Sequence, residues 1–444
     1  MPQDPAVVVI GLGYVGSCVA ATLADRGLRV TGIDTDTRLV SELSQGNTPL
    51  HEPGLQEVVA CATTSGRLQA TTDVAAVADA DIVIVAVGTP VREDGTLVDD
   101  QLRSACTAIG RHLRRGQLVL LKSTVPAGTT RSLVVPLLER HGGVTAGTDF
   151  ALAFTPERLA EGTALAELTS LPIVVGGIDE RSTQLAADFW QRALGVTALR
   201  QASLEAAEIV KLADNWWIDL NIALANELAK FCALFDVDVL DVITAANSIP
   251  KGNGNVNILL PSVGVGGSCL TKDPWMLWES ARQHGLDIQT PRVGREVNAG
   301  MPDHTAQLII DEMAELGRDP AAATVAVLGL AFKNNTSDLR ATPVLGVVNA
   351  LVKAGARVRL YDPVVDPGQA DEMFGIRPTT NLHDAVRGAD CVAVLAMHRQ
   401  FDDIDFADLP VADSCLLLDG RAYYPKEKIV MLRELGYRYR GIGR

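Results

Sequence analysis

Two series of short apolar runs constrain the fold of this chain more than any other feature. The runs are rich in Val, Ile and Leu and lack the apolar–polar alternation of a strand with one wet face. The first series comprises Ala6–Ile10, Arg29–Ile33, Asp81–Val87 and Leu118–Lys122, and the second comprises Thr324–Leu330, Arg357–Tyr361, Asp390–Ala396 and Cys415–Leu418. Strands that are apolar on both faces belong to helix-covered parallel sheets, so the sequence predicts an α/β protein with two Rossmann-like, doubly wound parallel-sheet domains.

The segment between the two series predicts a long helix. From Ser203 to Phe235 there is no Pro or Gly, and Ala, Leu, Glu and Ile dominate. Such a helix would be about 45 Å long, with Ser203, Glu205 and Glu208 in a capped start. Its apolar stripe favours packing against a second copy in a homodimer, although packing within the chain would also satisfy it. We expect an N-terminal Rossmann domain over residues 1–200, a central helical domain over 201–300 and a C-terminal Rossmann-like domain over 301–444.

Composition and charge exclude several classes of partner. The chain has 39 Lys and Arg against 54 Asp and Glu, a net charge of −15, which opposes general binding to nucleic acid or to anionic membranes. No apolar run is long enough to cross a bilayer, and no basic segment precedes the first one, so neither a membrane span nor a secretory signal is expected. The seven cysteines are scattered without CxxC spacing, which predicts reduced thiols in the cytoplasm and no metal site.

A glycine-rich turn follows the first predicted strand. Gly11, Gly13 and Gly16 form a GxGxxG pattern that opens a helix running to Arg26, and Asp34 ends the next strand. In a βαβ unit these glycines permit a tight turn, a close approach of pyrophosphate and close helix–strand packing. A carboxylate at the end of the second strand accepts hydrogen bonds from the adenosine ribose and repels a 2′-phosphate. The pattern therefore predicts NAD rather than NADP as cofactor.

A second candidate site surrounds Cys269, which follows Gly266-Gly267-Ser268 and precedes Lys272 and Asp273. A lone cysteine is usually a small buried apolar residue, and this is the expectation for the other six. A cation and a helix N-terminus near Cys269 would favour its thiolate. A nucleophilic thiol beside NAD suggests aldehyde oxidation, in which thiol addition, hydride loss and thioester hydrolysis follow one another.

Lys211 and Asn215 lie one turn apart on the predicted long helix and therefore share a face. If that face is turned to the substrate, the ammonium group could stabilise the alkoxide and oxyanion of the reaction. A lysine among apolar neighbours could equally extend its amine to solvent, and spacing alone does not distinguish the two.

Further motifs occur in a fixed order over essentially the whole chain. They are Gly11–Gly16, Glu52–Leu55, Val87–Pro90, Ser123–Thr129, Pro156–Gly162, Lys211 to Asn215, Gly266–Cys269, Gly329–Lys333, Asp338–Arg340 and Tyr439–Gly443. Together they resemble the UDP-glucose / UDP-N-acetylmannosamine (nucleotide-sugar 6-) dehydrogenase family. The resemblance implies two Rossmann-like domains joined by a helical dimerisation core. It also implies a four-electron oxidation of CH₂OH to COOH that consumes two NAD⁺ in succession.

The resemblance also implies roles for individual residues. In catalysis, Cys269 resembles the nucleophile, Lys211 and Asn215 the oxyanion and water partners, and Asp273 the residue that orients the hydrolytic water with Thr124 and Glu161. The implied cofactor contacts are Gly11, Gly13, Tyr14, Val15, Gly16, Asp34, Arg38, Thr89, Thr124, Glu161, Lys272 and Arg340. The implied substrate contacts are Glu157, Arg158, Leu159, Lys211, Asn215, Ile258, Leu259, Leu260, Pro261, Ser262, Gly266 and Lys333.

Each of these residues, taken alone, also has a structural explanation. Glu157 and Glu161 could belong to a solvated loop, Lys333 could be a surface charge, and Arg340 could be half of an ion pair with Asp338.

The motifs conflict on the sugar. Ser268 and Lys272-Asp273 resemble the UDP-glucose enzymes, whereas Arg158 and Pro274-Trp275 resemble the N-acetylhexosamine branch. Where the family often has an arginine that reaches a neighbouring subunit's substrate, this chain has Asn253 and Asn255, with Lys251 the nearest cation.

Four readings follow from the motifs. The favoured hypothesis is oxidation of UDP-glucose or TDP-glucose to the glucuronate, with UDP-glucose first, and its alternative is oxidation of UDP-N-acetylmannosamine or UDP-N-acetylglucosamine. A two-electron dehydrogenase of the hydroxyacid type and a non-enzymatic NAD-sensing module are the remaining alternatives.

Overall fold

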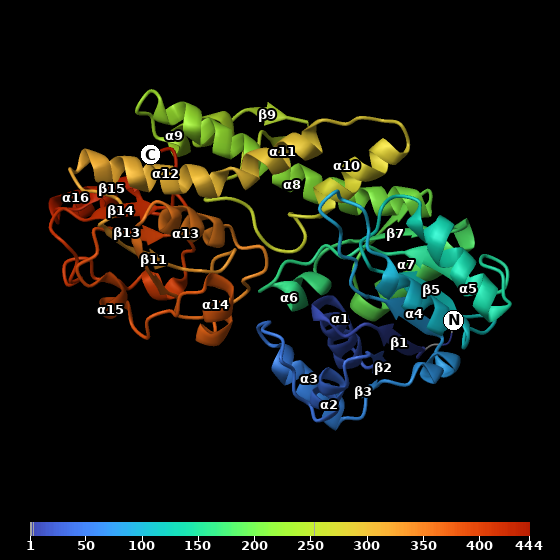
Figure 1. Cartoon of the computed structure of the whole chain (residues 1–444). Coiled ribbons are helices and arrows are strands. Elements are labelled where there is room, and N and C mark those ends of the chain that lie inside the picture. Colours follow the sequence, from blue (N-terminus) through green and yellow to red (C-terminus); the bar gives the residue numbers. More distant parts are fainter. Residues whose placement is uncertain (1, 3, 253) are drawn as a thin grey trace. The chain divides into compact units, whose positions relative to one another are not determined.

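The chain forms two compact units in the computed structural model, which describes residue 2, residues 4–252 and residues 254–444. The first unit comprises the chain up to Asp214 together with Met276–Leu286, and the second comprises Asn215–Trp275 and Asp287–Arg444. Each unit is built on one sheet (Figure 1).

The sheet of the first unit has eight strands in the order β3-β2-β1-β4-β5-β6-β7-β8. Their bounds are β1 Ala6–Ile10, β2 Arg29–Ile33, β3 Leu68–Thr71, β4 Ile82–Val85, β5 Leu118–Leu121, β6 Ala151–Phe154, β7 Ile173–Gly177 and β8 Ala198–Gln201. Neighbouring strands are parallel except β6 and β7, which pair antiparallel. The predicted parallel sheet is therefore present over the first six strands, and β7 and β8, which the sequence did not predict, run in the opposite direction.

Two helical layers cover this sheet. Helices α1 Tyr14–Asp25, α2 Thr37–Ser44, α3 Leu55–Thr64, α6 Ala164–Leu168 and α7 Glu180–Leu194 pack on one face. A 3₁₀ turn at Val74–Asp79, α4 Asp100–Gly110, a π-helical turn at Thr130–Val134 and α5 Val135–Gly142 pack on the other. Alternate strand residues enter the two cores: Val7 and Val9 enter one, Val8 and Ile10 the other. Both faces of β1 are thus buried, which explains its missing polar alternation.

The sheet of the second unit has five parallel strands in the order β12-β11-β13-β14-β15. Their bounds are β11 Thr324–Leu328, β12 Arg357–Tyr361, β13 Cys391–Val394, β14 Leu416–Asp419 and β15 Arg438–Gly441. Helices α12 Met301–Glu315, α13 Pro343–Lys353 and α14 Pro367–Phe374 cover one face. Helices α15 Leu382–Val386 and α16 Lys426–Glu434, with a 3₁₀ turn at Arg399–Phe401, cover the other.

The remaining elements are mostly helical. Helix α8 runs over 30 residues, Leu204–Ala233, and the backbone N–H of Ala206 donates to Ser203 Oγ at 3.1 Å, so the predicted cap is confirmed. It is followed by α9 Val239–Ala246, a short hairpin of β9 Pro250–Lys251 and β10 Gly254–Asn255, α10 Asp273–Gln283 and α11 Thr290–Ala299. No helix in the described ranges is both long and apolar enough to cross a membrane.

All eight predicted strands are present, with ends that differ by at most a few residues. The sequence missed β3, β6, β7, β8, β15 and the β9–β10 hairpin, which are four-residue or shorter strands except β7. The two Rossmann-like parallel sheets and the helical segment confirm the predicted fold class. The three-domain boundaries stay a prediction. Asn253 lies outside the described residues.

Candidate active site

The glycine-rich turn has the geometry of a dinucleotide site. Gly11 has a φ of +89°, and a side chain at Gly16 would place its Cβ 1.8 Å from the Gly11 carbonyl oxygen. At Gly13, by contrast, an added Cβ would meet nothing within 4 Å. Helix α1 begins at Tyr14 without any side-chain cap, so its first N–H groups are available to a pyrophosphate. The described residues therefore fit NAD at this turn.

Asp34 and Arg38 differ in their surroundings. The Asp34 carboxylate accepts the N–H of Leu12 at 2.6 Å and of Asp36 at 2.9 Å, and it remains partly exposed at the end of β2. It is therefore oriented toward the turn while keeping acceptor capacity for a ribose. The Arg38 side chain is 85% exposed and pairs with Glu42 at 3.1 Å. Its contact with the cofactor stays a prediction.

Thr89 and Thr124 follow the carboxyl ends of β4 and β5, the edge at which the glycine turn follows β1. Ligands of doubly wound sheets bind at this edge. Thr89 is buried and Thr124 half-buried. Their predicted cofactor roles thus agree with their position in the sheet.

Glu52, which belongs to the Glu52–Leu55 motif, is a further functional candidate. Its buried carboxylate accepts a hydrogen bond from the Tyr14 hydroxyl, from the N–H of Gly162 at 2.6 Å and from the N–H of Ala164 at 2.8 Å. Burial and the bond to Glu52 raise the pKa of Tyr14 well above its usual value. Glu52 thereby ties the start of α1 to the backbone directly after Glu161.

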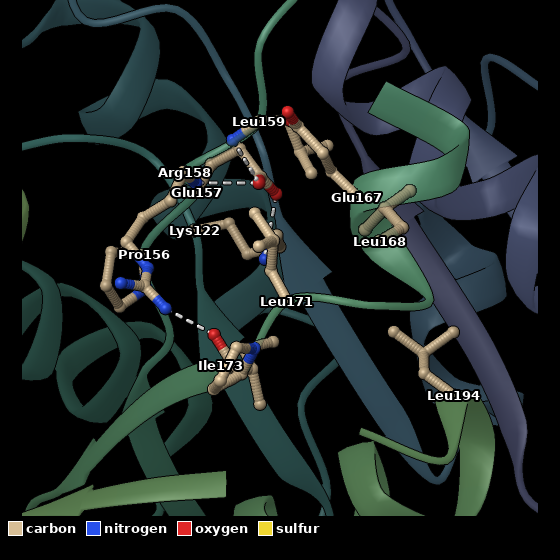
Figure 2. A pocket seen from close by; sticks show the side chains of 11 residues that line it. Lys122, Pro156, Glu157, Arg158, Leu159, Glu167, Leu168, Leu171, Ile173 and Leu194 are labelled. Atoms are coloured by element: carbon tan, nitrogen blue, oxygen red, sulfur yellow. Dashed lines mark hydrogen bonds and ion pairs between the residues drawn. The ribbon is translucent and has the colours of Figure 1, made fainter. Parts of the chain in front are cut away.

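Glu157 lies at a small pocket with Lys122 (Figure 2). Its carboxylate pairs with Lys122 Nζ at 3.0 Å and accepts the N–H of Arg158 at 2.7 Å and of Leu159 at 3.0 Å. The Lys122 side chain is 1% exposed, and its ammonium lies 4.9 Å from the ring centre of Trp190. Because the Glu157 side chain is only 12% exposed, the solvated-loop alternative is wrong for this residue.

Arg158 and Leu159 complete the same loop. The Arg158 guanidinium donates to the carbonyl oxygen of Pro172 and lies 3.9 Å from the Asp214 carboxylate, and Leu159 packs against the sheet core. Glu161 is half-buried. The substrate roles of these residues stay predictions.

Helix α8 carries polar residues on its buried face. Lys211 is 7% exposed and Asn215 is 6% exposed, so the expectation that Lys211 might reach solvent is wrong. One turn earlier, fully buried Glu208 accepts the N–H groups of Gly128 at 2.5 Å and Thr130 at 2.8 Å. Burial raises the pKa of Glu208 despite these bonds. Glu208 therefore anchors the loop after Thr124 to α8, a role beyond the cap that the sequence suggested.

The second unit brings Asn215, Lys272, Asp273 and Cys269 together. Asp273 is fully buried, and its carboxylate accepts Asn215 Nδ2 at 2.5 Å and Lys272 Nζ at 2.6 Å. Its N–H donates to the Cys269 carbonyl oxygen at 2.9 Å, which closes a turn just before α10. Cys269 is exposed. The Lys272 ammonium is thus engaged by Asp273.

All seven cysteines are free thiols in the structure. The expectation that the six other than Cys269 are buried is wrong for Cys61, which is exposed on α3. Helix α3 has one solvent-exposed face, and a small residue such as cysteine can lie on it. The sequence around Cys61 did not show which face of the helix is exposed.

The Cys269 loop packs on the loop after β11. An added Cβ at Gly266 would lie 2.5 Å from Phe332 Cβ and 2.7 Å from the Ala341 carbonyl oxygen, so only glycine fits. The N–H of Gly267 donates to the Arg340 carbonyl oxygen at 3.0 Å. The Arg340 guanidinium pairs with Asp338 at 2.5 Å, so the ion pair considered for it is present and its cofactor contact stays a prediction.

Asparagines that the sequence analysis missed hold the predicted substrate segment from Ile258 to Ser262. Asn247, Asn221 and Asn226 accept the N–H groups of Ile258, Leu259 and Ser262, each at 2.8 Å. Within this segment Leu260 is 56% exposed, whereas Pro261 and Ser262 are buried. The asparagines lie on α8 and at the end of α9, where isolated polar residues in apolar helices could have indicated a structural role.

Arg421 was also missed. It follows β14, and its guanidinium donates to the carbonyl oxygens of Leu395 and Phe332, each at 2.8 Å. Desolvation lowers the pKa of Arg421 to about 10. Lys333, directly after Phe332, is exposed at the same carboxyl edge of the second sheet.

Comparison with known proteins agrees with a dinucleotide site in the first unit. Three models of the UDP-glucose/GDP-mannose dehydrogenase family match the chain: the NAD binding domain at residues 5–194, the central domain at 205–300 and the UDP binding domain at 326–426. NAD is therefore the cofactor, and the predicted family is confirmed.

Similar proteins carry two activities in their names. The UDP-N-acetyl-D-mannosamine dehydrogenase of Pyrococcus horikoshii is 32% identical over 99% of both chains, and the UDP-glucose 6-dehydrogenase of Pseudomonas aeruginosa is 35% identical over 98% of this chain and 97% of its own. A solved UDP-D-ManNAc dehydrogenase structure from P. horikoshii has a TM-score of 0.88 at 30% identity, covering 99% of both chains. The chain belongs to the UDP-glucose/GDP-mannose dehydrogenase family and is an NAD-dependent oxidoreductase of nucleotide sugars.

Proposed function

We propose that this chain oxidises the C6 hydroxyl of a UDP-N-acetylhexosamine, with UDP-N-acetylmannosamine first, to the carboxylate through a thioester on Cys269. The observation that carries the chemistry is the geometry of the Cys269 turn. The Cys269 thiol is exposed, the backbone carbonyl of Cys269 accepts the N–H of Asp273, and the Asp273 carboxylate accepts a hydrogen bond from Asn215. Lys211 precedes Asn215 by one turn of the same helix.

The residues act in sequence in this proposal. Water accepts the proton of the C6 hydroxyl, Lys211 stabilises the resulting alkoxide, and a hydride leaves the C6 carbon to give the aldehyde. The Cys269 thiolate then adds to the aldehyde carbon, loss of a second hydride gives the thioester, and Asp273 orients the water that releases carboxylate and thiol. NAD, when bound, supplies the hydride acceptor for both oxidations.

The choice of sugar rests on relatives and on the loop around Arg158. Several similar proteins from archaea and from Campylobacter jejuni are named UDP-N-acetyl-D-mannosamine dehydrogenases, which favours this alternative over the glucose reading that the motifs suggested first. UDP-glucose is the second candidate, because Ser268, Lys272 and Asp273 match that branch and a 35% identical relative carries that name.

The test is an NADH assay of purified protein with UDP-N-acetylmannosamine, UDP-N-acetylglucosamine, UDP-glucose and TDP-glucose. We expect turnover with UDP-N-acetylmannosamine and two NADH for each carboxylate formed. Turnover with a glucose nucleotide alone would refute the proposed sugar. One NADH per product would refute the four-electron reaction, and no turnover with any of the four would refute the function.

We also propose a homodimer formed through α8. Four large apolar side chains at near-heptad spacing on this helix are exposed: Ile209 at 49%, Trp217 at 50%, Leu224 at 51% and Phe231 at 58%. With 3.6 residues per turn they lie roughly opposite Glu208, Asn215, Asp219 and Asn226, which are buried. A helix that exposes a stripe of large apolar side chains is suited to packing against a second copy of itself.

A further inference from the structure

The two sheets share one arrangement of hydrogen bonds directly after their first strands, β1 and β11. Gly11 donates to the Ile33 carbonyl at 2.8 Å, and Gly329 donates to the Tyr361 carbonyl at 3.0 Å. Both glycines have positive φ, +89° and +82°. The N–H of the next residue then donates to an aspartate at the end of the second strand: Leu12 to Asp34 at 2.6 Å, and Leu330 to Asp362 at 2.7 Å.

The two aspartates differ in what else they bind. Asp34 accepts one further N–H, that of Asp36, and stays partly exposed. Asp362 also accepts the N–H groups of Val364 at 2.9 Å and Val365 at 3.0 Å and meets His398 Nε2 at 3.0 Å. Its side chain is 1% exposed. The acid that a dinucleotide ribose would engage is thus already satisfied inside the second unit.

His398 stands two residues after Ala396, the residue against which Gly329 packs. In the first unit the corresponding position, two residues after Ala86, is Gly88, which has no side chain to offer. His398 is fully buried, and its Nδ1 accepts the N–H of Asn335 at 3.0 Å. With Nδ1 accepting, the ring proton lies on Nε2 and is donated to Asp362.

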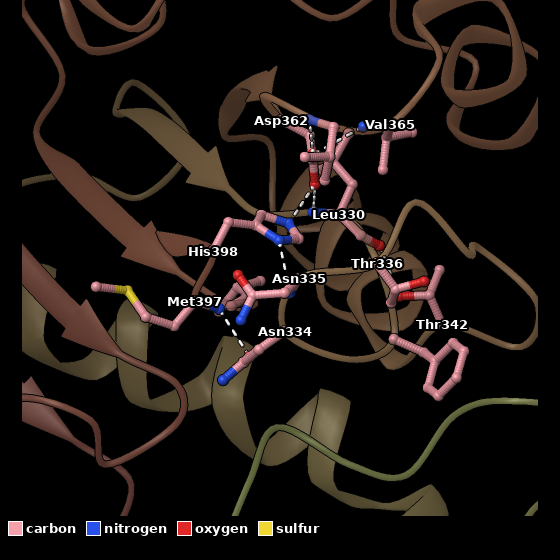
Figure 3. Close-up of polar contacts among 12 residues, drawn as sticks. Leu330, Asn334, Asn335, Thr336, Thr342, Asp362, Val365, Met397 and His398 are labelled. Atoms are coloured by element: carbon pink, nitrogen blue, oxygen red, sulfur yellow. Dashed lines mark hydrogen bonds and ion pairs between the residues drawn. The ribbon is translucent and has the colours of Figure 1, made fainter. Parts of the chain in front are cut away.

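The pair closes a network around the loop from Leu330 to Asn335 (Figure 3). Asp362 holds the start of the loop through Leu330, and His398 holds its end through Asn335. Two side-chain bonds reinforce that end: Asn334 accepts the N–H of Met397 at 2.9 Å, and Asn335 accepts that of Arg399 at 2.8 Å. Asn335 has a φ of +58°, a conformation that such bonds must hold in place. Phe332 and Lys333 lie between the two anchors.

We propose that His398 positions the nucleotide-binding loop: Asp362 fixes the ring proton on Nε2, Nδ1 therefore accepts from Asn335, and the loop held in this way places Lys333 at the carboxyl edge of the second sheet. The inference rests on the proposed function for the identity of the nucleotide, a uridine diphosphate. His398 and Asp362 act through the loop and touch no ligand. The acid at the end of β12 is therefore not available to a second dinucleotide.

The test separates the two bonds of His398. In His398→Asn the side-chain oxygen can replace Nδ1 and accept from Asn335, whereas in His398→Gln the amide can replace Nε2 and donate to Asp362. We expect His398→Gln and His398→Leu to weaken the binding of UDP, measured by calorimetry, by about tenfold. His398→Asn should retain most of the affinity. NAD affinity should be unchanged in all three variants, and the matched control is His383→Leu, an exposed histidine on α15.

A second readout needs no ligand. Amide hydrogen exchange of residues 331–336 should accelerate in His398→Gln and remain near the wild-type rate in His398→Asn. Unchanged UDP binding and unchanged exchange in His398→Gln and His398→Leu would overturn the inference, as would equal losses of UDP and NAD affinity. If the wild-type chain binds no UDP while the variants still change the amide exchange rates of the loop, the nucleotide in the proposed function is refuted. The role of His398 in positioning the loop then stands.

Discussion

At the scale of single residues, Cys269 differs from the other thiols in its surroundings. Five of the seven cysteines are buried, and Cys269 and Cys61 are exposed. Only Cys269 lies in a turn whose carbonyl is bonded by a buried aspartate that also engages an amide and an ammonium group. Exposure gives a thiol access to a substrate, and the bonded turn fixes its position.

We predict that Cys269→Ser lowers carboxylate formation on the order of 10³-fold or more, because an alcohol cannot form the thioester. NADH and product should be quantified together in the same reaction. Cys61→Ser, which removes the other exposed thiol, is the matched control and should leave activity unchanged. Continued carboxylate production by Cys269→Ser would show that the thiol is not the nucleophile.

From the buried Asp362 carboxylate we predict that the free energy of unfolding decreases at low pH. Burial alone would raise its pKa, but the bonds from His398 and from the N–H groups of Leu330 and Val364 outweigh it and lower the pKa below its usual value. A lowered carboxyl pKa stabilises the fold above its unfolded pKa, and this contribution is lost as the pH falls through the folded value.

Asp362→Asn should therefore lower the urea midpoint at about pH 6, and the gap to wild type should narrow as the pH falls below about 4. The measurement is urea unfolding over that range. Asp403→Asn, at an exposed carboxylate, serves as the comparison. A gap that is constant with pH would contradict the assigned role of the carboxylate.

At the scale of elements, glycines set how closely loops can pack. Gly266 lies against Phe332 and the Ala341 carbonyl, both in the loop that follows β11, so the Cys269 loop is shaped by a segment more than sixty residues away in the chain. The loop that carries Cys269 is thereby held by the close approach of its own backbone to Phe332 and Ala341.

Gly266→Ala should cost roughly 1–3 kcal/mol of stability through overpacking. It should also lower kcat, because the displaced loop carries Cys269. Thermal unfolding and steady-state kinetics measure the two effects. Gly300→Ala is the matched control, since an added Cβ there would meet only ordinary contacts at 3.6 Å. Full activity of Gly266→Ala with normal stability would show that the contact with Phe332 is unimportant.

Helix α8 also makes contacts that its own sequence did not predict. The sequence predicted its length and start, but not that four large apolar side chains are exposed while Glu208, Asn215, Asp219 and Asn226 are buried. Asp219, for example, is 1% exposed and pairs with Arg295 at 2.7 Å. The buried polar face holds the loops of Thr130, Asp273 and Ser262 through Glu208, Asn215 and Asn226.

At the scale of the whole molecule, the exposed apolar face of α8 predicts self-association. We expect light scattering to give twice the mass of one chain for wild type. Trp217→Glu with Leu224→Glu should give a monomer at micromolar concentration, because each buried charge would oppose the interface. Leu435→Glu, at another exposed leucine, should leave the dimer intact. A monomeric wild type would refute the proposed dimer.

The sequence by itself determined the two sheets, the glycine turn with Asp34 and the thiol loop. Each of these is written in a local pattern: strands buried on both faces are apolar throughout, and a turn at a phosphate site requires glycines at fixed spacing. Strands β7 and β8 illustrate the limit, because their direction depends on how the chain returns to the sheet and not on their own residues.

Only the tertiary structure decided which side chains are partners. Glu52 meets Gly162 across 110 residues, Lys122 meets Glu157 after its strand, and His398 meets Asp362 across 36 residues. It also decided that Lys211 is buried and that Arg340 pairs with Asp338. Such pairs form because separate strands end at the same edge of a sheet and their loops meet there, an outcome of strand order that no local run of residues specifies.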